Sequence, residues 1–326
     1  MIVALALQGI QATPYVAMAF LTSGHSLMPL LTSVMAWGAG FMTVVKLVEF
    51  AVKGQGPGQA SYGAMALFLM SSSAYWLLIF HGLSKFGAVA VLSAAILGAI
   101  LQPAFARCVL KAPKHRVASM GTLVSTTVMM IFAGGLIVKT RYVGAESEWA
   151  AVANAEGVIE LVSLGVVLAF NTILKLRITD KEETELRGFD ALGTSTIVWI
   201  ELIVVCLLGA AITGMQGTAD DFFALMPANL SPAEWSLDMW LVAYIGIGPT
   251  AIGLTGNILI GERLGVAMNA ALSYTKPLFA DIVQVGFRIS PFRLDVAWDL
   301  TAAALLAGFA AYQAMFNIAK PQKSQD

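Results

Sequence analysis

The sequence predicts an all-α integral membrane protein in which ten transmembrane helices form two inverted five-helix repeats. Three observations favour this fold class. The 326-residue chain is 58% hydrophobic and only 12% charged, with a mean hydropathy of +0.78, whereas soluble domains carry about 25% charged residues. Its apolar runs are long enough to cross a bilayer. A short motif built around a proline recurs about half a chain apart.

Ten apolar segments of about 20 residues, the length that a bilayer requires, follow one another along the chain. They are 2–21, 28–50, 62–80, 88–110, 117–138, 158–176, 191–213, 239–260, 266–287 and 297–318. The first has no basic segment before it and no clear cleavage site, so we expect it to be retained as a span. An odd number of spans in each half gives 1–150 and 151–326 as the two repeats, with the second inserted upside down relative to the first.

Lysine and arginine residues are unevenly shared between the segments that join these spans. With the N-terminus in the cytoplasm, 13 of the 19 fall on the inner side, among them Lys175 and Arg177, five fall outside, and Lys276 lies within the membrane. Because cytoplasmic loops are enriched in these residues, we expect both termini inside. The charged segment 177–190 is then expected to be a solvated cytoplasmic loop. The argument applies equally to a bacterial inner membrane and to a eukaryotic organelle or plasma membrane.

The span 266–287 carries residues that are rare in a membrane helix. Lys276 stands directly before Pro277, and Asp281 follows, in the order K-P-L-F-A-D. A charge at the bilayer centre costs about 2.5–3.5 kcal/mol even on the lenient insertion scale, and a proline frees backbone carbonyls that need a partner. Lys276 is about ten residues, roughly 15 Å, from either end of its span, so a lysine that merely reaches the interface is the less favoured alternative. We expect Lys276 to bind a carboxylate or phosphate group of a substrate.

A second copy of this motif lies in the first half of the chain. The segment Q-P-A-F-A-R, with Gln102, Pro103 and Arg107, stands 174 positions earlier (277 minus 103). The equivalence predicts that both prolines interrupt their helices and that Gln102 faces the substrate opposite Lys276. Arg107 either pairs with Asp281 or lies at the cytoplasmic end of its span. Inverted repeats with interrupted helices near the midplane are typical of alternating-access transporters.

Glycine and small residues in the later spans extend the pattern. The eighth span reads Y-I-G-I-G-P-T-A-I-G from Tyr244 to Gly253, the ninth reads A-A-L from Ala270 and P-L-F-A from Pro277, and 94–106 is a weaker copy of the ninth. Together with ten spans and the charge bias, this resembles the EamA-like, ten-helix members of the drug/metabolite transporter superfamily. The resemblance implies a substrate site between spans four and nine. Nucleotide-sugar and triose-phosphate carriers of that superfamily place a lysine in the corresponding helix, which implies an anionic or zwitterionic substrate.

Four further residues are candidates for parts of such a mechanism. Glu160 and Glu201 are lone carboxylates among apolar neighbours. Burial disfavours the charged form of a carboxylate, so either could carry a coupling proton. Glu201 lies deeper in its span, whereas Glu160, close to a helix start, alternatively faces water. Tyr274, two residues from Lys276, is the aromatic residue that we expect to line the site, and Pro249 is expected to kink the eighth span.

Other function classes receive little support from the sequence. The three histidines are scattered, the two cysteines lie in apolar runs, and no metal or phosphate-binding motif occurs. A net charge of −1 argues against nucleic acid as a partner. We therefore expect no enzyme activity, no cofactor and no metal, with a small-molecule substrate and the lipid bilayer as partners and a homodimer left open. A secondary transporter is the leading prediction. A channel or cation permease with Glu160, Glu201 and Asp281 along a pore, and a receptor or scaffold without transport, remain alternatives.

Overall fold

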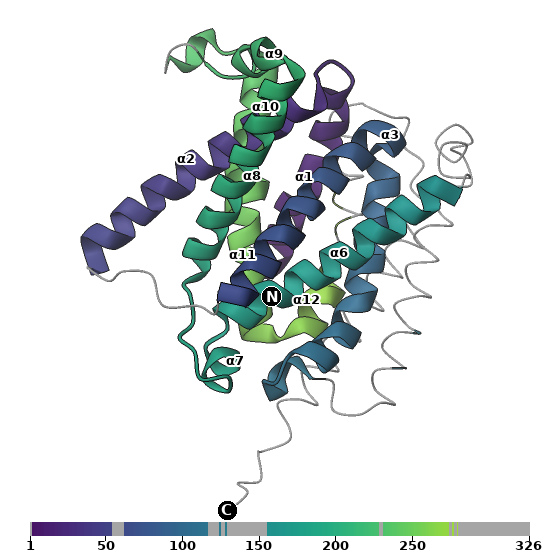
Figure 1. Cartoon of the computed structure of the whole chain (residues 1–326), viewed down its shortest axis with the longest axis vertical. Helices are drawn as coiled ribbons and strands as arrows, with labels where there is room; N and C mark the ends of the chain where they lie inside the picture. Colours follow the sequence, from purple (N-terminus) through teal and green to yellow (C-terminus); the bar gives the residue numbers. More distant parts are fainter. Residues whose placement is uncertain are drawn as a thin grey trace, which may run out of the picture.

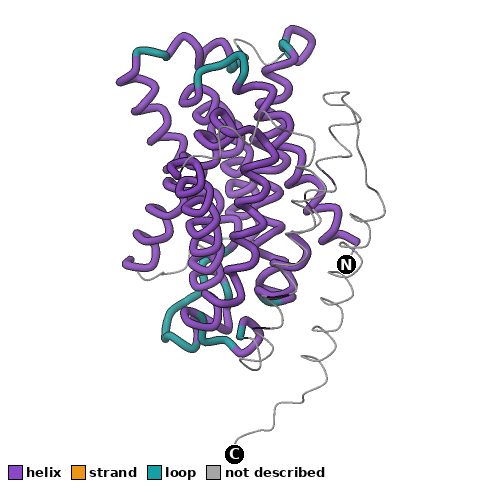
Figure 2. Tube along the Cα trace, turned by 90° about the vertical axis from the view of Figure 1, so that its right-hand side faces the viewer, coloured by secondary structure: helices purple, strands orange, loops and turns teal. Residues whose placement is uncertain are grey.

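The protein is a bundle of helices, which we describe from a computed structural model of the chain. The structure describes residues 2–53, 62–116, 155–227 and 231–273, together with the single residues 124, 128, 276 and 279. Figures 1 and 2 show helices joined by loops, and no strand occurs among these residues. The α-helices are α1 (Ile2–Thr22), α2 (Leu27–Lys53), α3 (Tyr62–Val109), α6 (Ala155–Thr179), α7 (Lys181–Glu185), α8 (Thr194–Gln216), α9 (Ala219–Ala224), α10 (Leu237–Ile245), α11 (Gly253–Leu264) and α12 (Val266–Ser273). Shorter pieces are the 3₁₀ turns η1 (Pro113–His115) and η2 (Pro232–Glu234) and the π-helical η3 (Gly246–Ile252).

Five stretches among the described residues are long and apolar enough to cross a membrane, so the protein is a membrane protein. They are Leu27–Val52, Tyr62–Phe86, Ala155–Thr179, Thr194–Gln216 and Leu237–Leu264. α1, α2, α6 and α8 agree with the ranges predicted from the sequence to within a few residues, and α10, η3 and α11 together cover the predicted span 239–260. The predicted spans 62–80 and 88–110 fall within the single helix α3. The predicted spans 117–138 and 297–318, and most of 266–287, lie outside the described residues.

The long helix α3 covers two predicted spans, 62–80 and 88–110, with no loop between them. It nevertheless folds back on itself, as the dark to light blue ribbon of Figure 1 shows. A β-carbon on Gly82 would lie 3.0 Å from Cγ2 of Val91, although nine residues of straight helix advance about 13.5 Å. The helical pattern also continues through Pro103 to Val109, so the predicted helix break at Pro103 is wrong. One proline removes a single N–H, and the bonds on either side hold the turn.

The helix predicted at 239–260 changes its winding around Pro249. α10 gives way to the π-helical η3, and the α-helical pattern resumes at Gly253 in α11. Proline lacks the N–H that an α-helix needs at this point, and a wider turn accommodates it; π-helical turns are frequent at functional sites. η3 also packs closely on α2, because a β-carbon on Gly246 would lie 2.5 Å from the carbonyl oxygen of Val34.

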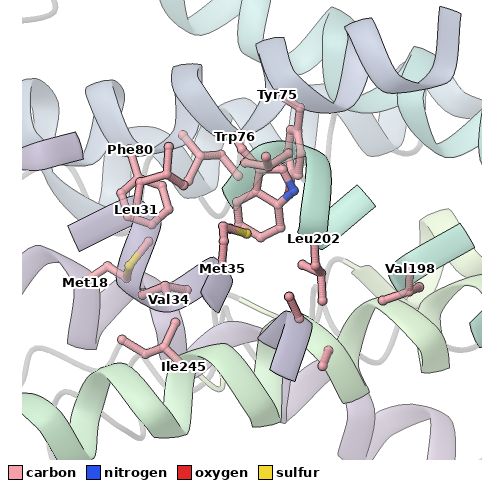
Figure 3. Packing of buried hydrophobic residues seen from close by; sticks show 14 of the residues in the cluster. Met18, Leu31, Val34, Met35, Tyr75, Trp76, Phe80, Val198, Leu202 and Ile245 are labelled. Carbon is pink, nitrogen blue, oxygen red and sulfur yellow. The ribbon is translucent and has the colours of Figure 1, made fainter. Parts of the chain in front are cut away.

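The apolar core joins α1, α2, α3, α8 and α10. Figure 3 shows Met18, Met35, Trp76, Phe80 and Ile245 packed together, and all five side chains are buried. The backbones of α3 and α6 also approach each other closely. A β-carbon on Gly98 would lie 2.9 Å from the carbonyl oxygen of Gly165, so small residues set the distance between these helices.

The segment 177–190 is an anchored structure, and the prediction of a solvated loop is wrong. Asp180 caps α7 and is 1% exposed, and Glu183 is fully buried. Glu183 accepts hydrogen bonds from the backbone N–H groups of Lys111 (2.6 Å) and Ala112 (2.7 Å) and from Nε of Arg187 (2.6 Å). These contacts fasten the segment to the chain that leaves α3. In the sequence this segment contains charges of both signs, a pattern that does not indicate that Asp180 and Glu183 are buried.

Asp180 is the electrostatic centre of this anchor. Its Oδ2 accepts hydrogen bonds from Nε2 of His115 (2.9 Å) and Nζ of Lys114 (2.6 Å), and its Oδ1 accepts one from the backbone N–H of Glu183 (3.2 Å). Burial acts to raise the pKa of Asp180, but the bonds from His115 and Lys114 outweigh it and lower the pKa to about 2. The carboxylate therefore stays charged at every physiological pH.

Candidate functional site: a polar cavity within the bundle

A small polar cavity of about 80 Å³ lies inside the bundle. Its wall is built by residues of α1, α3, α6, α10, η3, α11 and α12, together with Lys276. The apolar part of the wall includes Tyr75 and Trp76 from α3. The polar part gathers amides and ammonium groups from helices far apart in the sequence: Gln11, Asn171, Lys175, Asn257, Asn269 and Lys276. Apolar helices thus enclose a group of polar side chains.

Lys276 and Gln102, predicted to face the same substrate, both line a smaller cavity of about 20 Å³. Lys276 and Asn257 belong to the walls of both cavities, so the two spaces adjoin. Within the described part of the chain, Lys276 has no ion-pair or hydrogen-bond partner. An ammonium group that lines a cavity is a suitable ligand for an anion.

Several buried amide groups around these cavities also have unused hydrogen-bonding capacity. Oε1 of Gln102, Oδ1 of Asn257 and Oδ1 of Asn269 have no hydrogen-bond partner within the described residues. Gln11 donates through Nε2 to the carbonyl oxygen of Gly253 (2.5 Å), which leaves its Oε1 free. Buried polar atoms are normally satisfied, so these atoms are suited to hold water or the polar groups of a ligand.

Glu201 lies next to the larger cavity, but it is not the lone carboxylate that the sequence suggested. It is fully buried and forms an ion pair with Lys175, whose Nζ is 3.0 Å from Oε1 and 2.9 Å from Oε2. Nε1 of Trp76 donates a third bond to Oε1 (3.2 Å). The ring of Phe68 lies 5.8 Å from the same ammonium. Two lysines therefore line the cavity, and the carboxylate that pairs with one of them lies behind its wall.

Lys175 lines the larger cavity, although the sequence pattern predicts it outside the site. Its position near the end of the predicted span 158–176 predicts a cytoplasmic cation, yet only 5% of the residue is exposed. Asn171 lies one turn earlier on the same face of α6 and donates to Oγ of Ser72 (2.6 Å). A polar pair four residues apart in an apolar helix is the signal that could have placed Lys175 inside.

The other predicted carboxylate, Glu160, lies away from both cavities. Its Oε1 is 2.9 Å from Nδ1 of His81 and its Oε2 is 3.3 Å from Nζ of Lys85, and its side chain is 15% exposed. It belongs to a polar cluster between α3 and the start of α6, so it too has partners.

The remaining predicted site residues are placed only in part. Arg107 is half-buried near the end of α3 and lines neither cavity. Pro249 lies in the π-helical η3 and contributes to the wall of the larger cavity. Tyr274, Pro277 and Asp281 lie outside the described residues.

Comparison with known proteins gives a likeness of fold alone. No protein-family model and no curated protein matches this chain. Among solved structures, one crystal structure, described only as that of a protein, is similar over 96% of both chains, with a TM-score of 0.63 and 16% sequence identity. At that identity the likeness shows a shared fold over nearly the whole chain and says nothing of function.

Proposed function

We propose that the protein is a secondary transporter that moves a small anionic or zwitterionic solute across a membrane by alternating access. The proposal includes ten membrane spans in two inverted five-helix repeats, both termini in the cytoplasm, and membership of the drug/metabolite transporter superfamily, which the sequence resembles. The solute binds in the polar cavity beside Lys276.

The observation that carries the proposal is the charge in this cavity. Two ammonium groups, Lys175 and Lys276, line it, and among the described residues Glu201 pairs with Lys175 while Lys276 has no carboxylate partner. Ionisable side chains inside membrane helices are costly and mark substrate or ion pathways. Within the described part of the chain this leaves one ammonium without a counter-charge and several amide oxygens without a donor, which favours a solute with an anionic group and hydrogen-bond donors.

The size of the cavity supports a conformational cycle. Ligand sites usually measure about 300–1,000 Å³, so a cavity of about 80 Å³ must widen to hold an organic solute. The π-helical η3 supplies Pro249 and Thr250 to its wall and interrupts a membrane helix at the same level. Such an interruption provides a bending point for opening.

Side-chain contacts join neighbouring helices at both ends of α2. Near its N-terminus, His25 lies 2.9 Å from Asp238 and Ser26 donates to Asp221 (2.5 Å). Near its C-terminus, Glu49 accepts hydrogen bonds from Lys46 (2.7 Å) and Ser195 (2.8 Å). Breaking one set while keeping the other would expose the cavity to one side at a time, as alternating access requires.

Counterflow in proteoliposomes tests the proposal. Purified protein is reconstituted, the vesicles are loaded with unlabelled solute, and uptake of the labelled solute is followed for pyruvate, succinate, glutamate and glucose 6-phosphate, with glucose as the neutral control. We expect saturable uptake, stimulated by internal solute, for at least one anion and none for glucose. Uptake of no anion by folded protein, or a flux that neither saturates nor responds to internal solute, would contradict a carrier.

A further inference from the structure

The buried ion pair between Lys175 and Glu201 has a geometry that a simple anion site does not need. Lys175 and Trp76 line the cavity, whereas Glu201 lies behind them and contributes no atom to its wall. The carboxylate is fully buried, and its hydrogen-bond donors within the described residues are these same two side chains. Lys175 thus stands between the buried carboxylate and the space where a solute would bind.

An anion that enters this cavity competes with Glu201 for Lys175. Lys276 already offers one ammonium, and contact with Lys175 would give the anion a second. The exchange would leave Glu201 with Trp76 as its remaining donor. Removing one partner of a buried ion pair is strongly destabilising, because it leaves an uncompensated charge. Taking up a proton removes that charge, and the indole N–H of Trp76 can donate to the carboxyl group in either protonation state.

We propose that Lys175 is a second solute ligand, and that its transfer from Glu201 to the bound anion couples each anion to one proton. The inference rests on the proposed function and deepens it. On binding, the Lys175 ammonium exchanges the Glu201 carboxylate for the solute's anionic group, and Glu201 takes one proton from water. A monovalent anion adds one negative charge and the proton adds one positive charge, so the occupied site keeps the charge of the empty one. Release reverses both steps and gives electroneutral cotransport of anion and proton.

Other charged groups near α8 are held at its ends and do not compete for this role. Lys175 of α6 contacts Glu201 directly, and Lys276 lines the same cavity. At the N-terminal end of α8, Ser195 donates a hydrogen bond to Glu49 of α2, and Thr196 accepts one from Lys46 of α2. Thr194 donates a hydrogen bond to Glu262 of α11. Asp221 of α9, beyond the other end, is bound by Ser26.

The test measures equilibrium binding of labelled pyruvate, succinate and glutamate to the purified full-length protein, from about pH 6.5 to about 7.5, where each probe keeps nearly the same charge. In the unmodified protein we expect the Kd to rise with pH, approaching about tenfold per pH unit, the limit for one proton bound with each anion. Glu201→Gln, which is neutral at every pH, should still bind the anion but with no dependence on pH. Lys175→Gln should bind about 10- to 100-fold more weakly, as expected for the loss of one charge-assisted hydrogen bond.

Two further variants keep the test decisive. Lys175→Gln combined with Glu201→Gln removes both charges at nearly constant volume, so it should fold even if a single substitution does not. It should bind without pH dependence and more weakly than Glu201→Gln alone. Lys181→Gln removes a lysine that is 84% exposed and 3.7 Å from Glu185, and it should behave like the unmodified protein.

The outcomes separate this inference from the proposed function. Binding of none of the three anions by the folded, unmodified protein would overturn the anion site itself. Anion binding that does not change with pH in the unmodified protein, or that keeps its pH dependence in Glu201→Gln, would overturn the coupling while leaving the anion site intact.

Discussion

Replacing Asp180 by Asn removes one buried charge from the anchor of α7 while preserving its shape. The asparagine oxygen can still accept the backbone N–H of Glu183 and cap the helix, so the change isolates the charge. The interactions with His115 and Lys114 lower the pKa of Asp180 from its ordinary 3.8 to about 2. At about 1.4 kcal/mol for each unit of pKa, this difference corresponds to about 2.5 kcal/mol of folding free energy at neutral pH.

The direction of the pH dependence follows from the lowered pKa of Asp180. A carboxyl group whose pKa is lower in the folded protein stabilises it fully above the ordinary value, and this contribution is lost as the pH falls through the folded value. For Asp180 the window therefore lies between about pH 4 and about pH 2. Asp180→Asn should unfold several degrees below the unmodified protein at pH 7, and the gap should narrow as the pH falls through that window.

Circular dichroism measures the midpoint of thermal unfolding for both proteins in detergent across this pH range. Glu185→Gln is the matched control, because Glu185 is 64% exposed and pairs loosely with Lys181 at 3.7 Å. Its midpoint should match that of the unmodified protein. Equal midpoints for Asp180→Asn and the unmodified protein at pH 7, or a gap that is unchanged at low pH, would refute the electrostatic argument.

Three further predictions address packing, topology and the solute site. Gly246→Ala should destabilise the protein by about 1–3 kcal/mol through overpacking, because its β-carbon would meet the backbone of α2, whereas Gly40→Ala, with open space around it, should be neutral or stabilising in the same thermal assay. In a background without native cysteines, Asp220→Cys should react with an impermeant thiol reagent added outside intact cells and Lys181→Cys should not; the opposite pattern would reverse the proposed orientation. Lys276→Gln should weaken anion binding by about 10- to 100-fold at unchanged expression, and an unchanged Kd would exclude the lysine as a ligand.

The sequence predicted the helices well, because membrane-spanning length and hydropathy depend on local composition. It placed α1, α2, α6 and α8 within a few residues of their observed bounds. It failed at α3, where it expected a loop and the structure has a bent but continuous helix. A bend without turn residues depends on packing, here of Gly82 against Val91, and hydropathy does not report packing.

The candidate site was predicted in part, and the errors share one cause. Lys276 and Gln102 line a common cavity, as the proline motif suggested. Lys175 was assigned to the surface and Glu201 was considered alone, because a single sequence does not reveal which charges on different helices meet. The same limit applies to Asp180, whose partners His115 and Lys114 lie about 65 residues earlier in the chain. The positions of charged residues near the ends of spans can be predicted only when the tertiary contacts are known.

The position of a bound anion is the most direct test of the central claim. A structure determined with a transported anion should show it in the cavity lined by Lys175 and Lys276, within hydrogen-bonding distance of the Nζ of Lys276. An anion bound elsewhere, with this cavity unoccupied at saturating concentration, would contradict the account.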